Sequence, residues 1–248
     1  MTRSLRKNQS GFTLAELAIS VVIIGLLIGG LLGPIGRQVD QGRINETQKQ
    51  MEFAREALLG FAVVNKRLPC PDTDGDGIEQ ATCTTAATAV GNLPWATLGL
   101  FESDAWGTRF RYAVSSALAV APITLTSVGS LRVQQRNPAT KAMRDLAGGA
   151  APGAAAVIVS FGKNSFGGTL ANGSAAGVAR PNVPAVNADE TMNAAAAAVT
   201  FSTRTPIDPS TPCSDTVGIS SLCEFDDQVL WLSTPVVISR LVNAGQIP

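Results

Sequence analysis

Histidine is absent from the 248-residue sequence, and aromatic residues make up only 5% of it. Without histidine the chain cannot form a Ser-His-Asp or Cys-His nucleophile pair, an H-E-x-x-H zinc site or a histidine proton shuttle. Basic and acidic side chains number 19 each, and no segment concentrates the lysines and arginines. Because affinity for nucleic acid comes from clustered basic side chains, we expect no nucleic-acid partner.

Cysteine is also scarce. The four cysteines are Cys70, Cys83, Cys213 and Cys223, and none of them forms a C-x-x-C pair. Zinc sites and thiol-exchange motifs commonly use that spacing, so paired disulfides are the simpler interpretation. A bridge between Cys70 and Cys83 would close a tight acidic loop, although four cysteines permit three connectivities.

Charge is missing from a long segment near the N-terminus. Arg3, Arg6 and Lys7 precede Gly11, and no ionisable side chain occurs from Leu17 to Gly36. A helix of that length, at about 1.5 Å per residue, spans roughly 30 Å, the thickness of a bilayer core. We therefore expect one membrane span, with the N-terminus in the cytoplasm because the basic residues precede it. A cleaved secretory signal is the alternative, but its apolar run is shorter and ends in an A-x-A-like site that is missing here.

One carboxylate, Glu16, interrupts the apolar region between Phe12 and Gly36. An ionised group in hydrocarbon without a partner costs at least about 2.5 kcal/mol, so this residue requires an explanation. The simple one is that Glu16 lies near the membrane face and extends its carboxylate to water.

The order of Gly11, Phe12 and Glu16, after a basic leader and before an apolar helix, resembles the class III leader of type IV prepilins and type II secretion pseudopilins. The resemblance implies that prepilin peptidase, a membrane enzyme, cleaves after Gly11 and that Phe12 becomes the methylated N-terminal residue. Glu16 would then be the glutamate at the fifth mature position. In a stack of parallel helices its carboxylate could meet the Phe12 amine of a neighbouring subunit, and each buried charge would neutralise the other.

Beyond Arg37 the apolar residues keep a helical spacing, and Leu68-Pro69-Cys70-Pro71 ends the pattern. We therefore predict a helix from about Phe12 to about Lys66. Strands are expected near residues 110–114, 123–133, 156–161 and 228–233, with a short helix at 189–198. The predicted fold class is α+β, with a long N-terminal helix, half of it transmembrane, packed on an antiparallel β-sheet head, the lollipop shape of pilins.

The predicted organisation has four parts: a leader at residues 1–11, a transmembrane and filament-core helix at 12–36, an amphipathic continuation at 37–67, and a globular head at 68–248.

Calcium is the one cofactor that the sequence suggests. Asp72, Asp74 and Asp76, followed by Gly77, reproduce positions 1, 3, 5 and 6 of a calcium loop. Cys83 stands where the twelfth position of an EF-hand has glutamate, which excludes a standard EF-hand. A looser calcium site that also uses Glu79 remains open, beside the alternative of a solvated acidic turn.

Two segments of the head resemble the calcium-holding C-terminal region of major pseudopilins. They are the glycine-rich segment 160–168 and the segment 225–231, where the resemblance would place calcium on Asp226 and Asp227. This chain inserts a long segment between them. Cys213 and Cys223, just before the second segment, resemble the C-terminal disulfide region of type IV pilins.

The sequence predicts a structural subunit without catalytic activity, a minor pilin or pseudopilin. Its expected partners are prepilin peptidase, other pilin or pseudopilin subunits and the inner-membrane assembly platform. It would occupy the bacterial inner membrane as a single-pass protein with a periplasmic head, and then the fibre. Two alternatives keep the same anchor: a membrane-tethered periplasmic enzyme that uses head carboxylates such as Asp72 and Asp226, and an adhesin or DNA-uptake subunit.

Overall fold

The computed structural model describes residues 13–149, 153–208, 212–216 and 221–248, and for residues 28–35 the backbone alone. The chain divides into two compact units, Met1–Gly42 and Arg43–Pro248. Within the described part of the chain, no helix combines the length and the apolar character needed to cross a membrane. The side chains of residues 28–35, which belong to the predicted span, lie outside the described set.

Helix α1, Leu14–Asn65, is the longest element. It ends where Lys66 adopts a positive φ of 57° and donates its backbone N–H to the carbonyl of Ala62 at 2.8 Å. A left-handed residue after the last turn is a common helix ending, and Pro69 follows closely. The helix predicted from Phe12 to Lys66 therefore agrees with the observed bounds, except that Phe12 lies outside the described residues.

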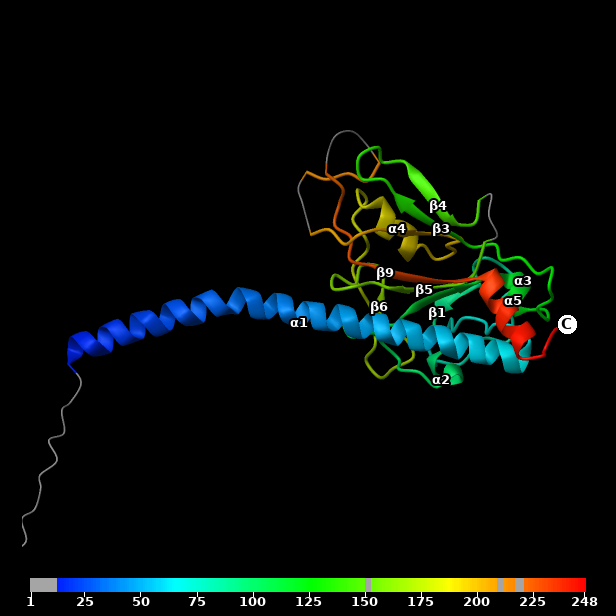
Figure 1. The fold of residues 1–248 in the computed structure, drawn as a ribbon, viewed down its shortest axis with the longest axis horizontal. Helices are drawn as coiled ribbons and strands as arrows, with labels where there is room; N and C mark the ends of the chain where they lie inside the picture. Colours follow the sequence, from blue (N-terminus) through cyan, green and yellow to red (C-terminus); the bar gives the residue numbers. More distant parts are fainter. Residues whose placement is uncertain (1–12, 150–152, 209–211, 217–220) are drawn as a thin grey trace, which may run out of the picture. The chain divides into compact units, whose positions relative to one another are not determined.

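The second unit is built around a sheet with the strand order β1-β2-β5-β9, in which all neighbours are antiparallel. The strands are β1 (Val90–Asn92), β2 (Arg111–Val114), β5 (Ala154–Ser160) and β9 (Gln228–Ser233). Every residue of β5 is buried, as expected for an apolar run covered on both faces. Figure 1 shows the sheet beside the cyan part of α1 and the red helix α5 (Thr234–Asn243).

One face of this sheet packs against the C-terminal part of α1. Met51, Ala54 and Leu58 are at most 2% exposed and share an apolar cluster with Tyr112 of β2. Their spacings of three and four place them on one face of the helix. Val237 and Leu241 of α5 belong to the same cluster.

The other face of the central sheet meets a second sheet of order β4-β3-β8, formed by β3 (Arg132–Arg136), β4 (Met143–Ala147) and β8 (Thr200–Thr203). Strand β3 pairs antiparallel with β4 and parallel with β8. Val133 and Phe201 pack with Val157 of β5 in a second apolar cluster. The shorter elements are α2 (Trp95–Leu98), α3 (Ser116–Ala119), β6 (Thr169–Leu170), β7 (Val178–Ala179) and α4 (Ala188–Ala194).

The predicted α+β class with a mainly antiparallel head is confirmed. The strand predicted at residues 123–133 is wrong over most of its length, because β3 begins only at Arg132. The alternating pattern there belongs to a loop that buries Ile123 and Leu131 and exposes Leu125 and Val128. The Ile123 N–H donates to the carbonyl of Lys66, at the end of α1, at 2.7 Å. The alternation of apolar and polar residues in this loop therefore does not correspond to one buried strand face, because Leu125 is exposed where a strand face shared with Ile123 would bury it.

Candidate functional site

The first described residues of the chain form a reciprocal helix cap. The Thr13 N–H and the Thr13 hydroxyl donate to Glu16 Oε2 at 2.9 and 2.8 Å, and the Glu16 N–H donates to Thr13 Oγ1 at 3.3 Å. This is a capping box, which satisfies two backbone donors at the start of α1. Glu16 therefore has a local structural role as well as the role predicted in assembly. Gly11 and Phe12, the predicted processing residues, lie outside the described residues.

The helix that follows Glu16 has an apolar surface without cover from the chain's own described residues. All side chains from Thr13 to Leu27 are exposed, among them Leu14 at 87% and Leu26 at 73%. Exposed apolar patches of this kind mark contacts with lipid or with other proteins.

The loop predicted to bind calcium brings its three carboxylates together. One oxygen each from Asp72, Asp74 and Asp76 lies within 4.8 Å of the others. Asp72 is buried, but its Oδ1 and Oδ2 accept backbone N–H groups from Gly75 at 2.6 Å and Gly77 at 3.2 Å. Asp74 and Asp76 are exposed to solvent. These bonds close the loop, and no buried oxygen of the three described carboxylates lacks a hydrogen-bond partner.

Glu79 does not join the three aspartates of this loop, although the sequence left open a calcium site that also uses it. Its carboxylate pairs with both terminal nitrogens of Arg67, at 2.8 and 2.9 Å, and accepts the Cys70 N–H at 3.1 Å. The Cys70–Cys83 disulfide closes the segment. Glu79 thus joins the end of the helical region to the disulfide loop, and its oxygens are engaged there.

A second acidic cluster is formed by Glu190, Asp226 and Asp227. Glu190 is held at the start of α4, where its N–H donates to Oδ1 of the N-cap residue Asn187 at 3.2 Å. Asp226 and Asp227 directly precede β9. The turn after β5 reaches Asp226 through Gly162, which has a φ of +56° and where a Cβ would overlap the carbonyl oxygen of Asp226. Glycine is therefore required for this close approach.

The two aspartates have few hydrogen bonds for their burial, whereas Glu190 accepts from the Asn187 amide at 2.8 Å, from the Asn164 amide at 3.2 Å and from the Asp226 N–H at 3.2 Å. One oxygen of each of the three carboxylates lies within 4.8 Å of the others. The Asn193 amide donates to Asp227 Oδ2 at 2.8 Å, and the Asn164 N–H donates to Asp226 Oδ2 at 2.8 Å. The Oδ1 atoms of both aspartates are buried and accept no hydrogen bond from any described residue. An unsatisfied buried acceptor is costly, so these two atoms indicate a missing partner.

Burial raises the pKa of all three carboxyl groups. It raises the pKa of Glu190 to about 7 and that of Asp226 to about 6, and it raises the pKa of Asp227 well above its usual range. The neighbouring Arg204 lowers the pKa of Asp227 only in part, and its own ion pairs are with Asp189 at 3.2 Å and with Asp215 at 3.0 Å. Arg204 thus forms its ion pairs with other aspartates and not with the three carboxylates of the cluster.

This donor set fits a hard divalent cation better than the Asp72 loop does. All the donors are carboxylate oxygens, the ligands that calcium and magnesium prefer, and calcium lies 2.3–2.6 Å from its ligands. Two oxygens about 4.8 Å apart can therefore share one calcium ion. The two unpartnered Oδ1 atoms are the observation that separates this cluster from the Asp72 loop.

Sequence reasoning placed Asp226 and Asp227 in a calcium region but missed Glu190 and Asn193. Both missed residues belong to α4, which lies in the inserted segment, more than 30 residues before Asp226. The Cys213–Cys223 disulfide lies between them in sequence, and the Cys223 N–H donates to Asp215 at 3.0 Å. No spacing motif joins these residues, so only the fold reveals that they meet.

Comparison with known proteins identifies the N-terminal segment. Residues 6–32 match the family model of the prokaryotic N-terminal methylation motif, which is the class III leader of type IV pilins and pseudopilins. No curated protein and no solved structure matches the chain. The motif covers the cap at Thr13 and Glu16 and stops before the head.

In calcium-free buffer, we expect the free energy of unfolding to decrease as the pH rises from about 4 to about 7. The pKa values of Glu190 and Asp226 are raised to about 7 and 6, whereas unfolded carboxyl groups titrate near 4. The folded chain therefore binds more protons in this interval, and its stability is lost as they dissociate. Urea unfolding of the full chain in detergent with EDTA at several pH values measures the slope. Glu190→Gln should flatten it, and a stability that rises over this interval would contradict the assignment.

Proposed function

We propose that the chain is a minor pilin or pseudopilin, a structural subunit of a type IV pilus or a type II secretion pseudopilus. Prepilin peptidase would cleave it after Gly11 and methylate Phe12, and the mature subunit would enter a helical fibre. The observation that carries the proposal is the match of residues 6–32 to the N-terminal methylation motif. The length of the chain, greater than that of many major pilins, favours a minor subunit.

Before assembly, residues 12–36 would span the bacterial inner membrane once, with the N-terminus in the cytoplasm and the head in the periplasm. The uncharged run from Leu17 to Gly36 and the basic residues before Gly11 support this topology. The exposed apolar side chains of residues 14–27 also support it, because they need cover from lipid or from other subunits. The inner-membrane assembly platform would be the partner that transfers the helix from lipid to fibre.

In the fibre, Glu16 would pair with the amine of Phe12 on a neighbouring subunit. Only Oε2 of Glu16 takes part in the bonds with Thr13 that are described above. Oε1 accepts no hydrogen bond from a described residue, and the side chain is exposed. One carboxylate could therefore cap its own helix and receive a neighbour's amine, and only one axial stagger of the helices would satisfy both charges.

We assign no catalytic role to the head. An enzyme without histidine would depend on pairs of carboxylates. The carboxylate clusters among the described residues are the groups around Asp72 and around Asp227. The first closes its own loop through hydrogen bonds, and for the second we propose a cation site below.

We further propose that Glu190, Asp226 and Asp227 bind calcium. The bound ion would fix α4 against the start of β9 and so secure the inserted segment to the central sheet. The two unpartnered Oδ1 atoms and the close grouping of three carboxylates support this site. Asp72, Asp74 and Asp76 remain the second candidate, the one that sequence spacing suggested.

Two variants separate the helix cap of Glu16 from its charge. Glu16→Gln keeps an oxygen that accepts the Thr13 N–H, since glutamine also serves in capping boxes, but it removes the negative charge. We expect Glu16→Gln to insert into the membrane at the wild-type level and to be lost from fibres by tenfold or more. Quantitative immunoblots of membranes and sheared fibres measure both pools. Thr13→Ala, which removes the hydroxyl of the cap and keeps the charge, is the matched control and should still assemble. Wild-type incorporation of Glu16→Gln would exclude the charge pair.

Calcium should raise the melting temperature of the full chain in detergent, and Asp227→Asn should weaken calcium affinity by about tenfold or more. Without calcium the same variant should melt at or above the wild-type temperature, because burial disfavours the ionised form of the Asp227 carboxylate that the variant removes. Asp74→Asn, at the exposed position of the other loop, is the matched control. Loss of calcium stabilisation in Asp74→Asn but not in Asp227→Asn would move the site to the Asp72 loop.

A further inference from the structure

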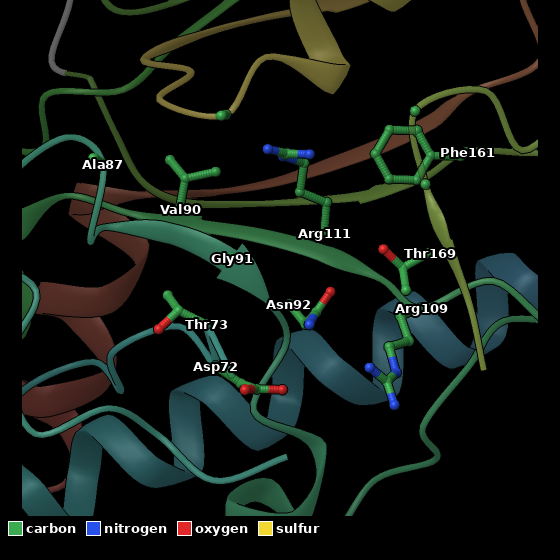
Figure 2. A pocket seen from close by; sticks show the side chains of 13 residues that line it. Asp72, Thr73, Ala87, Val90, Gly91, Asn92, Arg109, Arg111, Phe161 and Thr169 are labelled. Atoms are coloured by element: carbon green, nitrogen blue, oxygen red, sulfur yellow. The ribbon is translucent and has the colours of Figure 1, made fainter. Parts of the chain in front are cut away.

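A pocket of about 290 Å³ lies on the central sheet, and none of the three carboxylates of the cluster around Glu190 lines it. Strands β1 and β2 form part of its wall, and Phe161, Gly168 and Thr169 line another part. Its residues all belong to the unit Arg43–Pro248. Figure 2 shows Arg111 rising from β2 on the same side as Val90 and Phe161.

The guanidinium of Arg111 is the unusual group in this pocket. Its Nη2 donates to the carbonyl of Ala195 at 2.8 Å, and the ring of Phe161 lies 6.0 Å from its Cζ. Its Nε is buried and has no hydrogen-bond partner among the described residues. No described carboxylate forms an ion pair with it, and burial lowers the pKa of Arg111 to about 10. The positive charge is thus half removed from water without an anion to balance it.

The other arginines that the described head buries are balanced. Arg109 lines the same pocket but pairs with Glu102 at 2.6 Å and donates to the carbonyls of Ser174 and Ala175. Arg136 pairs with Asp189 at 2.8 Å, and Arg204 with two aspartates. The half-buried Arg180 resembles Arg111 in having a buried Nε without a hydrogen-bond partner among the described residues. Arg111 differs from it in lining a pocket, and a pocket can admit an anion from outside the chain.

Asp72 is the one carboxylate among the described residues that line the pocket, and it does not serve Arg111. In Figure 2 its side chain points to the opposite side of the strands from Arg111, as does the side chain of Arg109. Both Asp72 oxygens already accept N–H groups in their own loop. The half of the pocket around Arg111 is therefore cationic, with the hydroxyl of Thr169 as a further polar group.

We propose that this pocket binds a small oxyanion, held by the guanidinium of Arg111. A guanidinium donates to two oxygens of a carboxylate or a phosphate at once, and such charge-assisted bonds are roughly twice as strong as neutral ones. The pocket volume suits a small ion or a single acidic group, and the Phe161 ring supplies an apolar part of the wall. The site lies outside the N-terminal motif and does not depend on fibre assembly.

Isothermal titration of the full chain in detergent, at fixed ionic strength in chloride, tests the site with sodium phosphate and sodium acetate as separate probes. We expect saturable binding of at least one anion, and the stronger one identifies the class of oxyanion. Arg111→Gln should weaken that binding by about tenfold or more, as expected for the loss of a charged hydrogen bond. Arg144→Gln, an exposed arginine of β4 outside the pocket, is the charge-matched control and should bind as the wild type does.

Arg111→Lys provides a second measurement if Arg111→Gln does not fold. Lysine keeps the charge but not the planar fork, so binding should be weaker than in the wild type and still measurable. Equal affinities in the wild type and in the folded Arg111 variants would overturn the proposal. The absence of saturable binding of either anion to the wild type would overturn it as well.

Discussion

A single carboxylate in an otherwise uncharged run of residues is the constraint on which the proposed function depends. Glu16 is the one ionisable side chain from Phe12 to Gly36. In water it would need only the local bonds that it makes with Thr13. Once lipid or neighbouring helices cover the apolar side chains around it, its charge needs a cation. Processing after Gly11 would supply that cation as a new amine, so maturation and assembly would be linked by one charge pair.

In the head, too, a buried charged group is stabilised by a partner of opposite charge. Buried arginines such as Arg109 and Arg136 have carboxylate partners within the chain. The buried carboxylate cluster at Asp227 and the half-buried guanidinium of Arg111 do not. The cluster thus fits an added cation, and the guanidinium fits an added anion. The head would be completed by small ions as well as by its own packing.

The sequence predicted the features that depend on local pattern. The long helix and the strand β9 could be predicted because hydrophobic spacing and proline positions decide them. The bounds of strand β3 could not, because the loop before it has the alternating apolar pattern of a strand but buries Ile123 and exposes Leu125. Glu16 could be singled out from the sequence, because its charge stands out against an apolar run, and its role in assembly stays a prediction. Glu190 and Arg111 could not be singled out in the same way. The role proposed for Glu190 depends on the distant aspartates that the fold brings next to it, and the role proposed for Arg111 depends on the lack of a carboxylate that pairs with it among the described residues.

The amino terminus of the mature subunit tests the central claim most directly. Mass spectrometry of the protein extracted from cells with an active prepilin peptidase should find a chain that begins at Phe12 and carries one added methyl group on its amine. Such a chain would possess the cation that Glu16 requires. A chain that still begins at Met1 in those cells would contradict the proposed processing, and with it the pairing on which assembly is based.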